Sequence, residues 1–302
     1  MTASPPHQPD ASPLLAVEAL SIAFPGQGGR RAVESVSFSM GAERVGIVGE
    51  SGSGKSLTAR AIMGLLPASA RLEAETLAVA GRSLLAFSPR DWTHFRGREV
   101  GLVLQDPRVA LDPVMAVGAQ IEESLRLHTK LGRAERRDKV LAALESVGLP
   151  DPVRIARAYP HELSGGMGQR AMIASVLVTE PRLLIADEPT SALDHHLRDQ
   201  VLELLIGLTE ARGMGLILIS HDLEQVSRVC DRAIVMFRGR IVDRGRAADL
   251  PLSTHPYTST LWRCRPSATT RGTRLPTLDR ASLDAAHLDA ASLETASLET
   301  SP

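Results

Sequence analysis

Residues 163–194 read LSGGMGQRAMIASVLVTEPRLLIADEPTSALD, and this stretch decides the fold class of the chain. Its Ser-Gly-Gly start predicts a turn that opens a helix, whose first backbone N–H groups point outward and can bind phosphate oxygens. The short apolar run at 183–186 predicts a buried strand. Asp187 and Glu188 follow where that strand should leave the sheet, and carboxylates there can hold a metal ion or a water. The stretch therefore combines an anion site with two carboxylates.

A second glycine-rich stretch comes earlier, at residues 49–56, and reads GESGSGKS. This is the G-x-x-x-x-G-K-[ST] pattern, and it follows a short apolar strand and precedes a helix predicted to run to Leu66 and to stop at Pro67. The glycines let the backbone wrap phosphates, Lys55 reaches the β- and γ-phosphates, and Ser56 offers its hydroxyl to Mg²⁺. The pattern predicts a P-loop for a nucleoside triphosphate.

Together the two stretches resemble the ATP-binding subunits of ATP-binding-cassette (ABC) transporters. Residues 164–169 match the signature motif of that family, 183–188 its Walker B strand, and 191–194 its D-loop. Met167, where many members have Gln, resembles the importers of dipeptides, oligopeptides and nickel. The resemblance implies an α/β fold: a P-loop NTPase core with an antiparallel β edge subdomain and an inserted helical subdomain.

The resemblance also assigns roles to matching residues. It implies catalytic roles for Lys55, Gln105, Glu188 and His221, where Gln105 and His221 each follow a predicted strand. It implies ATP and Mg²⁺ as ligands, with Ser56, Gln105 and Asp187 on the metal. ATP contacts are implied for Phe24, Gly49, Ser51, Gly52, Ser53, Gly54, Lys55, Ser56, Leu57, Ser164, Gly165, Gly166, Gln169 and Asp194. Phe24 is expected to stack on adenine, although an aromatic that simply packs in the core or a loop is the alternative.

The remaining pattern predicts further elements of the cassette. Residues 14–22 and 32–39 predict two antiparallel strands, and 72–79 another strand. Residues 92–98 read as a connecting segment. Residues 233–237 and 240–243 predict a closing hairpin.

Four regions are expected along the chain: a flexible leader at 1–13, the ATPase domain at 14–250 with its helical subdomain at about 106–178, a C-terminal extension at 251–266, and a tail at 267–302. The extension contains HPYT, which resembles a segment of the peptide and nickel importers. Relatives can hold an iron–sulfur cluster after it, but only Cys264 is present here. The tail repeats an Ala/Ser-Leu-Asp/Glu pattern every five residues and predicts weakly helical or disordered chain.

The composition narrows the classes of function and the compartment that are expected for the chain. Lys and Arg number 34 against 35 Asp and Glu, so no basic field argues for nucleic acid. The longest apolar runs fall far short of the roughly 20 residues that span a membrane. The leader is rich in Pro and Ser without an apolar core, which predicts a cytosolic protein. The two cysteines, Cys230 and Cys264, lack metal-site spacing and suit a reducing compartment.

The leading hypothesis is an ATP-hydrolysing subunit that energises an importer of peptides, nickel or a similar small solute. Its expected partners are transmembrane permease subunits, a second ABC ATPase subunit (a heteromer favoured, a homodimer possible) and, through the complex, an extracytoplasmic solute-binding protein. It would lie at the cytoplasmic face of the cell membrane. A soluble ABC ATPase acting on DNA or ribosomes is the alternative, but two cassettes or a coiled-coil insertion would be expected. A regulatory subunit would be expected to lack a catalytic residue, and all four are present.

Overall fold

The fold is built on a six-stranded sheet with the order β11-β10-β3-β9-β8-β7. The structure is a computed structural model that describes residues 13–25, 31–191, 193 and 195–265. Neighbours from β10 to β7 are parallel, and β11 closes the edge as an antiparallel hairpin with β10. The strands are β3 (Arg44–Val48), β7 (Val100–Val103), β8 (Leu183–Asp187), β9 (Gly215–Ser220), β10 (Arg232–Phe237) and β11 (Arg240–Arg246).

Both faces of this sheet are buried, because alternate residues of each strand point to opposite sides. Along β8, Leu184 and Ala186 join an apolar cluster formed with the helices α7 (Gly165–Leu177), α8 (His195–Ala211) and α9 (Leu223–Val229). Leu183 and Ile185 join a second cluster with α1 (Lys55–Ile62) and the edge sheet. The continuous apolar runs predicted as buried strands are the consequence of this two-sided cover.

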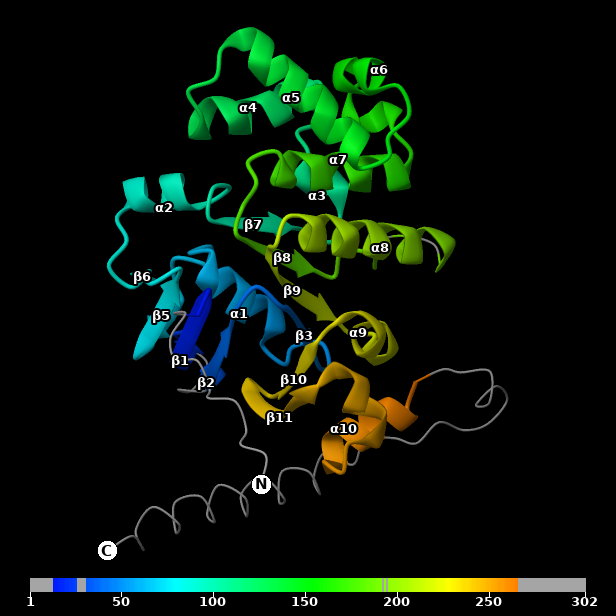
Figure 1. Cartoon of the computed structure of the whole chain (residues 1–302). Helices are drawn as coiled ribbons and strands as arrows, with labels where there is room; N and C mark the ends of the chain where they lie inside the picture. Colours follow the sequence, from blue (N-terminus) through cyan, green and yellow to red (C-terminus); the bar gives the residue numbers. More distant parts are fainter. Residues whose placement is uncertain (1–12, 26–30, 192, 194, 266–302) are drawn as a thin grey trace, which may run out of the picture.

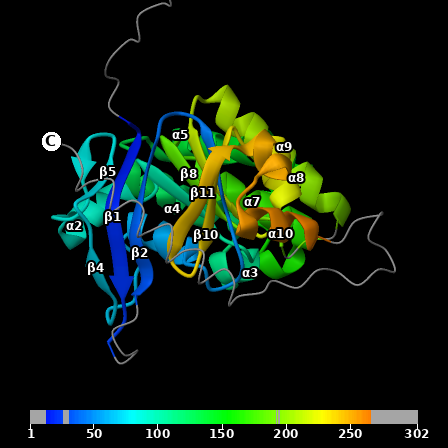
Figure 2. The same cartoon turned by 90° about the horizontal axis from the view of Figure 1, so that it is seen from below.

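The edge sheet is antiparallel with the order β2-β1-β5-β6, and β4 also pairs with β1. Its strands are β1 (Leu15–Ala23), β2 (Arg31–Met40), β4 (Arg71–Glu73), β5 (Thr76–Val79) and β6 (Arg82–Ser83). Seen from below, this sheet lies on one side of β10 and β11, and helices α9 and α10 (Pro256–Arg263) lie on the other (Figure 2). The architecture confirms the predicted fold class, a P-loop core with an antiparallel edge.

Three local predictions are wrong. The helix after the P-loop ends at Ile62 rather than Leu66, because Gly64 has a φ of 60° that breaks it before Pro67 is reached. A Cβ at Gly64 would lie 2.5 Å from the Trp92 ring, so no other residue fits there. The strand predicted at 72–79 is two strands, β4 and β5. The connecting segment at 92–98 is mostly the helix α2 (Pro89–Phe95), which begins with a Ser88–Asp91 capping box.

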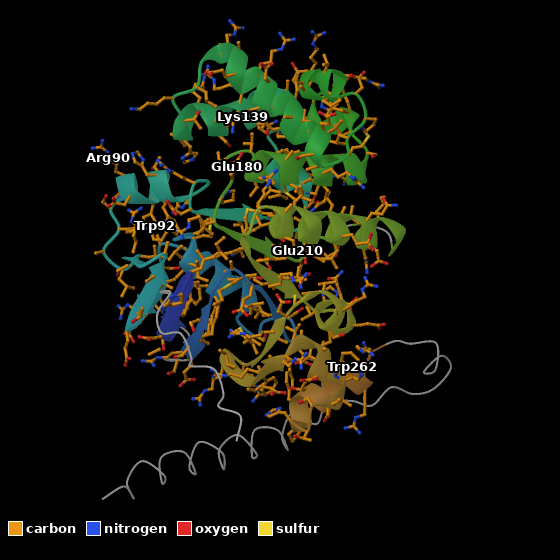
Figure 3. The ribbon with its side chains drawn as sticks, viewed as in Figure 1. Arg90, Trp92, Lys139, Glu180, Glu210 and Trp262 are labelled. Carbon is orange, nitrogen blue, oxygen red and sulfur yellow. The ribbon has the colours of Figure 1, made fainter. Side chains whose placement is uncertain are left out.

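Further helices lie between β7 and β8 in sequence, and they form the end of the molecule opposite α10 (Figure 1). Lys139 of this region and Glu180, next to α7, are 3.4 Å apart between charged atoms (Figure 3). The elements are α3 (Pro107–Ala110), α4 (Val117–His128), α5 (Arg133–Ser146), α6 (Pro152–Arg157) and the 3₁₀ turn η1 (Pro160–Glu162); a second 3₁₀ turn, η2 (Ala247–Leu252), precedes α10.

Across the described part of the chain, every helix is too short or too polar to cross a membrane. The predicted boundaries of the four regions stay predictions. The leader up to residue 12, the tail from residue 266 and Asp194 lie outside the described residues.

Candidate nucleotide-binding site

The residues singled out by the sequence motifs gather at one edge of the parallel sheet. The strands β3, β9, β8 and β7 are consecutive neighbours and parallel, so their carboxyl ends share that edge. The P-loop follows β3, His221 follows β9, Glu188 follows β8 and Gln105 comes shortly after β7. Ligands of α/β sheets bind outside the carboxyl ends of the strands. The topology alone therefore brings these four segments to one place.

The P-loop has a shape that only glycine permits at two positions. Gly49 has a φ of 150°, and a Cβ there would lie 2.1 Å from the carbonyl oxygen of Met236 in β10. Gly54, the N-cap of α1, has a φ of 102°, and a Cβ there would lie 3.1 Å from the carbonyl oxygen of Ala32. Ser51 and Gly52 are exposed at the tip of the loop. The loop thus presents backbone at the N-terminus of a helix, where a phosphate binds.

Lys55 is held inside this loop. Its side chain is 5% exposed, and Nζ donates hydrogen bonds to the carbonyl oxygens of Gly49 and Glu50, each at 2.8 Å. Burial lowers the pKa of the ammonium below its usual range, while the carboxylates of Glu188, Asp187 and Glu50 oppose that shift. An ammonium in this position is a cation with few waters around it, which strengthens its attraction for phosphate oxygens.

Ser56 and Asp187 form the contact between the P-loop helix and the Walker B strand. The Ser56 hydroxyl donates to Oδ1 of Asp187 at 2.9 Å. Burial raises the pKa of the Asp187 carboxyl, against the effect of that hydrogen bond. The Ser56 hydroxyl and the Asp187 carboxylate are oxygen ligands of the kind that Mg²⁺ takes. The amide oxygen of Gln105, which is exposed just after β7 on the strand next to β8, is of the same kind. Mg²⁺ commonly takes one or two carboxylates and completes its shell with phosphates and waters.

Glu188 turns away from the strand that carries Asp187. Its φ is 49°, a left-handed conformation that is uncommon for a residue with a side chain, and its N–H donates to the carbonyl of Ile219 at 2.9 Å. Oε2 of Glu188 lies 3.3 Å from Nδ1 of His221, whose side chain is 60% exposed. The strained backbone thus places a carboxylate and an imidazole together at the open edge of the site.

The signature segment opens helix α7 and faces solvent. Ser164 is the N-cap, and its hydroxyl accepts from the N–H of Met167 at 3.3 Å. Ser164 and Gly165 are exposed, and a Cβ added to Gly165 would meet no atom within 4 Å. Gly166 is buried, and a Cβ there would lie 3.1 Å from Leu197. The outer side of this helix start is therefore open to a ligand or a second molecule.

Gln169 was expected among the ATP contacts, and the structure places it elsewhere. Its side chain is 0% exposed, and Nε2 donates to the carbonyl oxygen of Pro189 at 2.6 Å. This bond ties the signature helix to the segment directly after Glu188. A side chain enclosed in this way presents no surface to a nucleotide, so this geometry does not support the expected contact with ATP.

Two other residues that were expected to contact ATP, Phe24 and Leu57, lie against the edge sheet. Phe24, just beyond β1, is half-buried and packs against the apolar cluster of the edge sheet, so part of its ring remains accessible. Its contact with adenine stays a prediction. Leu57, in the first turn of α1, also packs against that cluster.

One residue at the site was not singled out by its sequence. The hydroxyl of Tyr257 in α10 accepts a hydrogen bond from the backbone N–H of Glu50 at 3.2 Å. The two residues are 207 positions apart, and no local pattern connects them. The sequence showed only that the HPYT segment, which contains Tyr257, resembles a segment of the peptide and nickel importers; it gave Tyr257 no role.

Comparison with known proteins agrees with this geometry. The family model described as ABC transporter matches residues 33–191. The chain is 42% identical over 268 residues to the dipeptide transport ATP-binding protein DppD of Escherichia coli, covering 88% of this chain and 82% of that protein. It is 43% identical over 275 residues to the probable peptide ABC transporter ATP-binding protein y4tR of Sinorhizobium fredii, covering 89% of this chain and 82% of that protein.

Solved structures show the same fold. The dimeric post-hydrolysis state of the ATP-binding cassette MJ0796 bound to ADP and Pi superposes with a TM-score of 0.67 at 25% identity, covering 77% of this chain and 98% of that one. The structure of cbiO1 from Clostridium perfringens, part of the transporter complex cbiONQ, gives 0.66 at 28% identity, covering 80% of this chain and 92% of that one. The chain therefore belongs to the ABC transporter family, and it is an ATPase of the cassette type.

Proposed function

We propose that this chain binds and hydrolyses ATP to drive a membrane importer of peptides. One observation carries the ATPase: the Ser56–Asp187 and Glu188–His221 pairs lie at the same sheet edge as a P-loop with a buried lysine. The relatives named for dipeptide and peptide transport, at 42% and 43% identity, support the peptide substrate. They also favour transport over the soluble ABC ATPase that the sequence left as an alternative.

In this proposal each group at the sheet edge has a separate task. Lys55 and the P-loop backbone hold the phosphates, and Phe24 stacks on adenine. Ser56, Asp187 and Gln105 would hold Mg²⁺, which supplies charge neutralisation at the phosphates. Glu188 orients a water in line with the γ-phosphorus and takes its proton, and His221 contacts the γ-phosphate.

The active unit contains two cassettes arranged head to tail. One chain supplies one P-loop and one signature, and the start of α7 is open on its outer side at Ser164 and Gly165. The signature of one subunit then closes over the ATP held by Lys55 of the other. Asp194, which lies outside the described residues, is expected at the same ATP from the family resemblance. A second, similar ATPase is the favoured partner, with two copies of this chain as the other arrangement.

The remaining partners lie in the membrane and beyond it. Permease subunits would bind this chain at the cytoplasmic face of the membrane, and an extracytoplasmic solute-binding protein would deliver the peptide. Affinity capture of the complex from its native membrane, followed by peptide uptake into vesicles with ATP enclosed, tests this arrangement. Nickel uptake without peptide uptake would contradict the proposed substrate, and capture without any membrane subunit would contradict transport.

Mixed variants test the shared site. Lys55→Ala and Ser164→Arg each inactivate a homodimer, but a mixture contains dimers in which one site has both intact groups. Partial recovery of hydrolysis in the mixture supports a homodimer. If no mixing ratio recovers activity, and addition of the second ATPase restores it to the unmodified chain, the active unit is the heteromer.

A further inference from the structure

The peptide unit that joins Gly49 and Glu50 is held at both ends. Its N–H donates to the hydroxyl of Tyr257 at 3.2 Å, and its carbonyl oxygen accepts from Nζ of Lys55 at 2.8 Å. A peptide unit is planar, so its two ends turn together. We propose that Tyr257 is a positioning residue that sets the orientation of this peptide, and through it the place of Lys55, for ATP. The inference rests on the proposed function.

The Tyr257 ring has little freedom. The side chain is 0% exposed, and its ring packs on that of Phe237 with centroids 4.5 Å apart and planes at 42°. Phe237 ends β10, the strand that runs parallel to β3 and whose Met236 carbonyl lies against Gly49. The same strand therefore supports the phenol ring and the start of the P-loop.

The segment that carries Tyr257 is fixed to the sheet independently of the P-loop. Oδ2 of Asp243 in β11 accepts hydrogen bonds from the hydroxyls of Ser253, at 2.6 Å, and Thr258, at 2.7 Å. Thr258 is fully buried. Figure 3 shows Trp262 of the same helix at the end of the molecule away from the helices between β7 and β8. Because packing and two hydroxyl contacts hold the segment, loss of one of them leaves Tyr257 in place.

The consequence for catalysis is preorganisation. Lys55 can serve the phosphates only from within a loop whose backbone already has its bound shape, and ordering a loop at the moment of binding costs affinity. The Tyr257 hydroxyl fixes one peptide of that loop before ATP arrives. It touches neither the phosphates nor the attacking water in this arrangement, so its effect should fall on ATP binding rather than on the chemical step.

Tyr257→Phe in the full chain tests this, since it removes the hydroxyl and keeps the ring on Phe237. We expect the KM for ATP and the dissociation constant of ATP to rise about three- to tenfold, the loss of one ordinary hydrogen bond, while kcat at saturating ATP stays near the parental value. Tyr159→Phe, at the exposed tyrosine before the signature, is the matched control and should change neither constant.

Thr258→Val is the second control. It removes a buried hydroxyl hydrogen bond from the same helix without touching the P-loop, so it should lower the unfolding midpoint and leave the KM unchanged. Equal KM values for Tyr257→Phe and the parent, or an equal rise of the KM in Thr258→Val, would overturn this inference and would leave the proposed function standing. Failure of the unmodified chain to bind ATP would overturn the proposed function, and the inference with it.

Discussion

Two charged groups at the site are held in states that water would not favour. Lys55 is buried and its pKa is lowered, whereas Asp187 is half-buried and its pKa is raised; in both, burial disfavours the charged form. In the protein alone, burial disfavours each charge, and a partner of opposite sign would stabilise it. That partner is phosphate for the lysine and a divalent cation for the aspartate. Binding of a phosphate or of a divalent cation would therefore offset part of the cost of burying these charges.

Glu188→Gln separates binding from chemistry. The amide keeps the shape and a hydrogen-bonding oxygen but cannot take a proton from water. We expect ATP affinity close to the parental value, single-turnover hydrolysis slower by on the order of a hundredfold or more, as loss of a general base typically costs, and accumulation of a closed, ATP-bound dimer. Nucleotide titration, single-turnover kinetics and the mass of the dimer measure the three effects.

Controls for this variant are available on the same chain. Glu180→Gln removes a carboxylate of the same type from an exposed ion pair with Lys139 and should leave hydrolysis unchanged. Lys55→Ala should instead lose ATP affinity. A Glu188→Gln protein that hydrolyses ATP at the parental rate would remove Glu188 from the mechanism.

Asp187→Asn should stabilise the nucleotide-free protein at neutral pH. A raised folded-state pKa means that the folded protein binds the Asp187 proton more tightly than the unfolded chain. That contribution to stability is fully present below the ordinary value of 3.8 and is lost as pH rises through the folded value, so the ionised carboxylate is unfavourable at pH 7. The Asn variant avoids this cost and should unfold a few degrees higher in a thermal scan at pH 7.

The pH dependence is the check on the cause. The advantage of Asp187→Asn should shrink as pH falls from 7 toward 4, because the parental carboxyl then takes up its proton. Glu188 adds to the raised pKa, whereas Ser56, Arg60 and Lys55 act against it. An advantage that is constant with pH, or a loss of stability at pH 7, would contradict this account. The variant should also lose Mg²⁺-dependent hydrolysis.

For single residues, the sequence predicted which side chains the site contains better than it predicted where each side chain lies. The motifs name Lys55, Asp187, Glu188 and His221, which the structure brings to one edge, while their catalytic roles stay predictions. The motifs could not reveal that Gln169 is enclosed, because a spacing says nothing about which side of a helix is covered. Nor could they reveal Tyr257, whose contact with Glu50 depends on the whole sheet.

Among the elements, helix α7 combines a buried body with an open first turn. Ala171 to Ala174 are buried, whereas Gly165 has open space around the position of a Cβ. Nothing in the described chain requires glycine at 165 for packing. In the two-cassette proposal that space accommodates the ATP held by the partner.

Gly165→Ala should therefore harm function without harming the fold. Alanine favours helix over glycine by up to about 1 kcal/mol, so the unfolding midpoint should hold or rise, while ATP hydrolysis falls at least about tenfold if a methyl group blocks closure over the nucleotide. Gly207→Ala, at an exposed glycine of α8 with equally open surroundings, is the matched control and should keep full activity. Unchanged hydrolysis in Gly165→Ala would count against a tight contact at the signature.

Helices and strands were predicted well where the pattern of apolar residues is strong, and poorly where a turn or a cap sets the end of the element. The parallel strands, the β1–β2 pair and the closing hairpin follow from apolar runs bounded by turns. The end of α1 depends on the contact between Gly64 and Trp92, and the start of α2 on a Ser88–Asp91 cap followed by proline. These are tertiary contacts and local capping, which a survey of apolar residues does not register.

For the molecule as a whole, truncation after Pro266 should leave the ATPase intact. Within the described residues, both apolar clusters are assembled from positions up to Trp262. The five-residue repeat offers one leucine per repeat to bury, too little to offset the cost of ordering it. ATP affinity and hydrolysis should stay near the parental values. Truncation after Leu252 removes Tyr257, Leu261 and Trp262 from the apolar cluster, so it should lower the unfolding midpoint as well as raise the KM. Failure of the chain that ends at Pro266 to fold would show that the repeat packs on the core.

The fold class could be predicted for the whole molecule because three motifs in a fixed order imply one topology. The helices between Gln105 and Walker B were expected from the family resemblance, and they lie at the end opposite α10 (Figure 1). The chain order does not show that residues after 252 return to the P-loop. That return depends on how the segment after β11 packs on the sheet and on the P-loop.

The sheet order has a consequence for synthesis. β3, which leads into the P-loop, pairs only with β9 and β10 in the described chain, and Gly215 comes 167 positions after Val48. At roughly 5–20 residues per second, the ribosome needs on the order of 10–40 s to supply those partners. Arrested chains ending at Gly213 should fail to bind ATP-agarose, and chains ending at Arg265 should bind it. Nucleotide can therefore stabilise the nascent chain only after β9 and β10 have been synthesised.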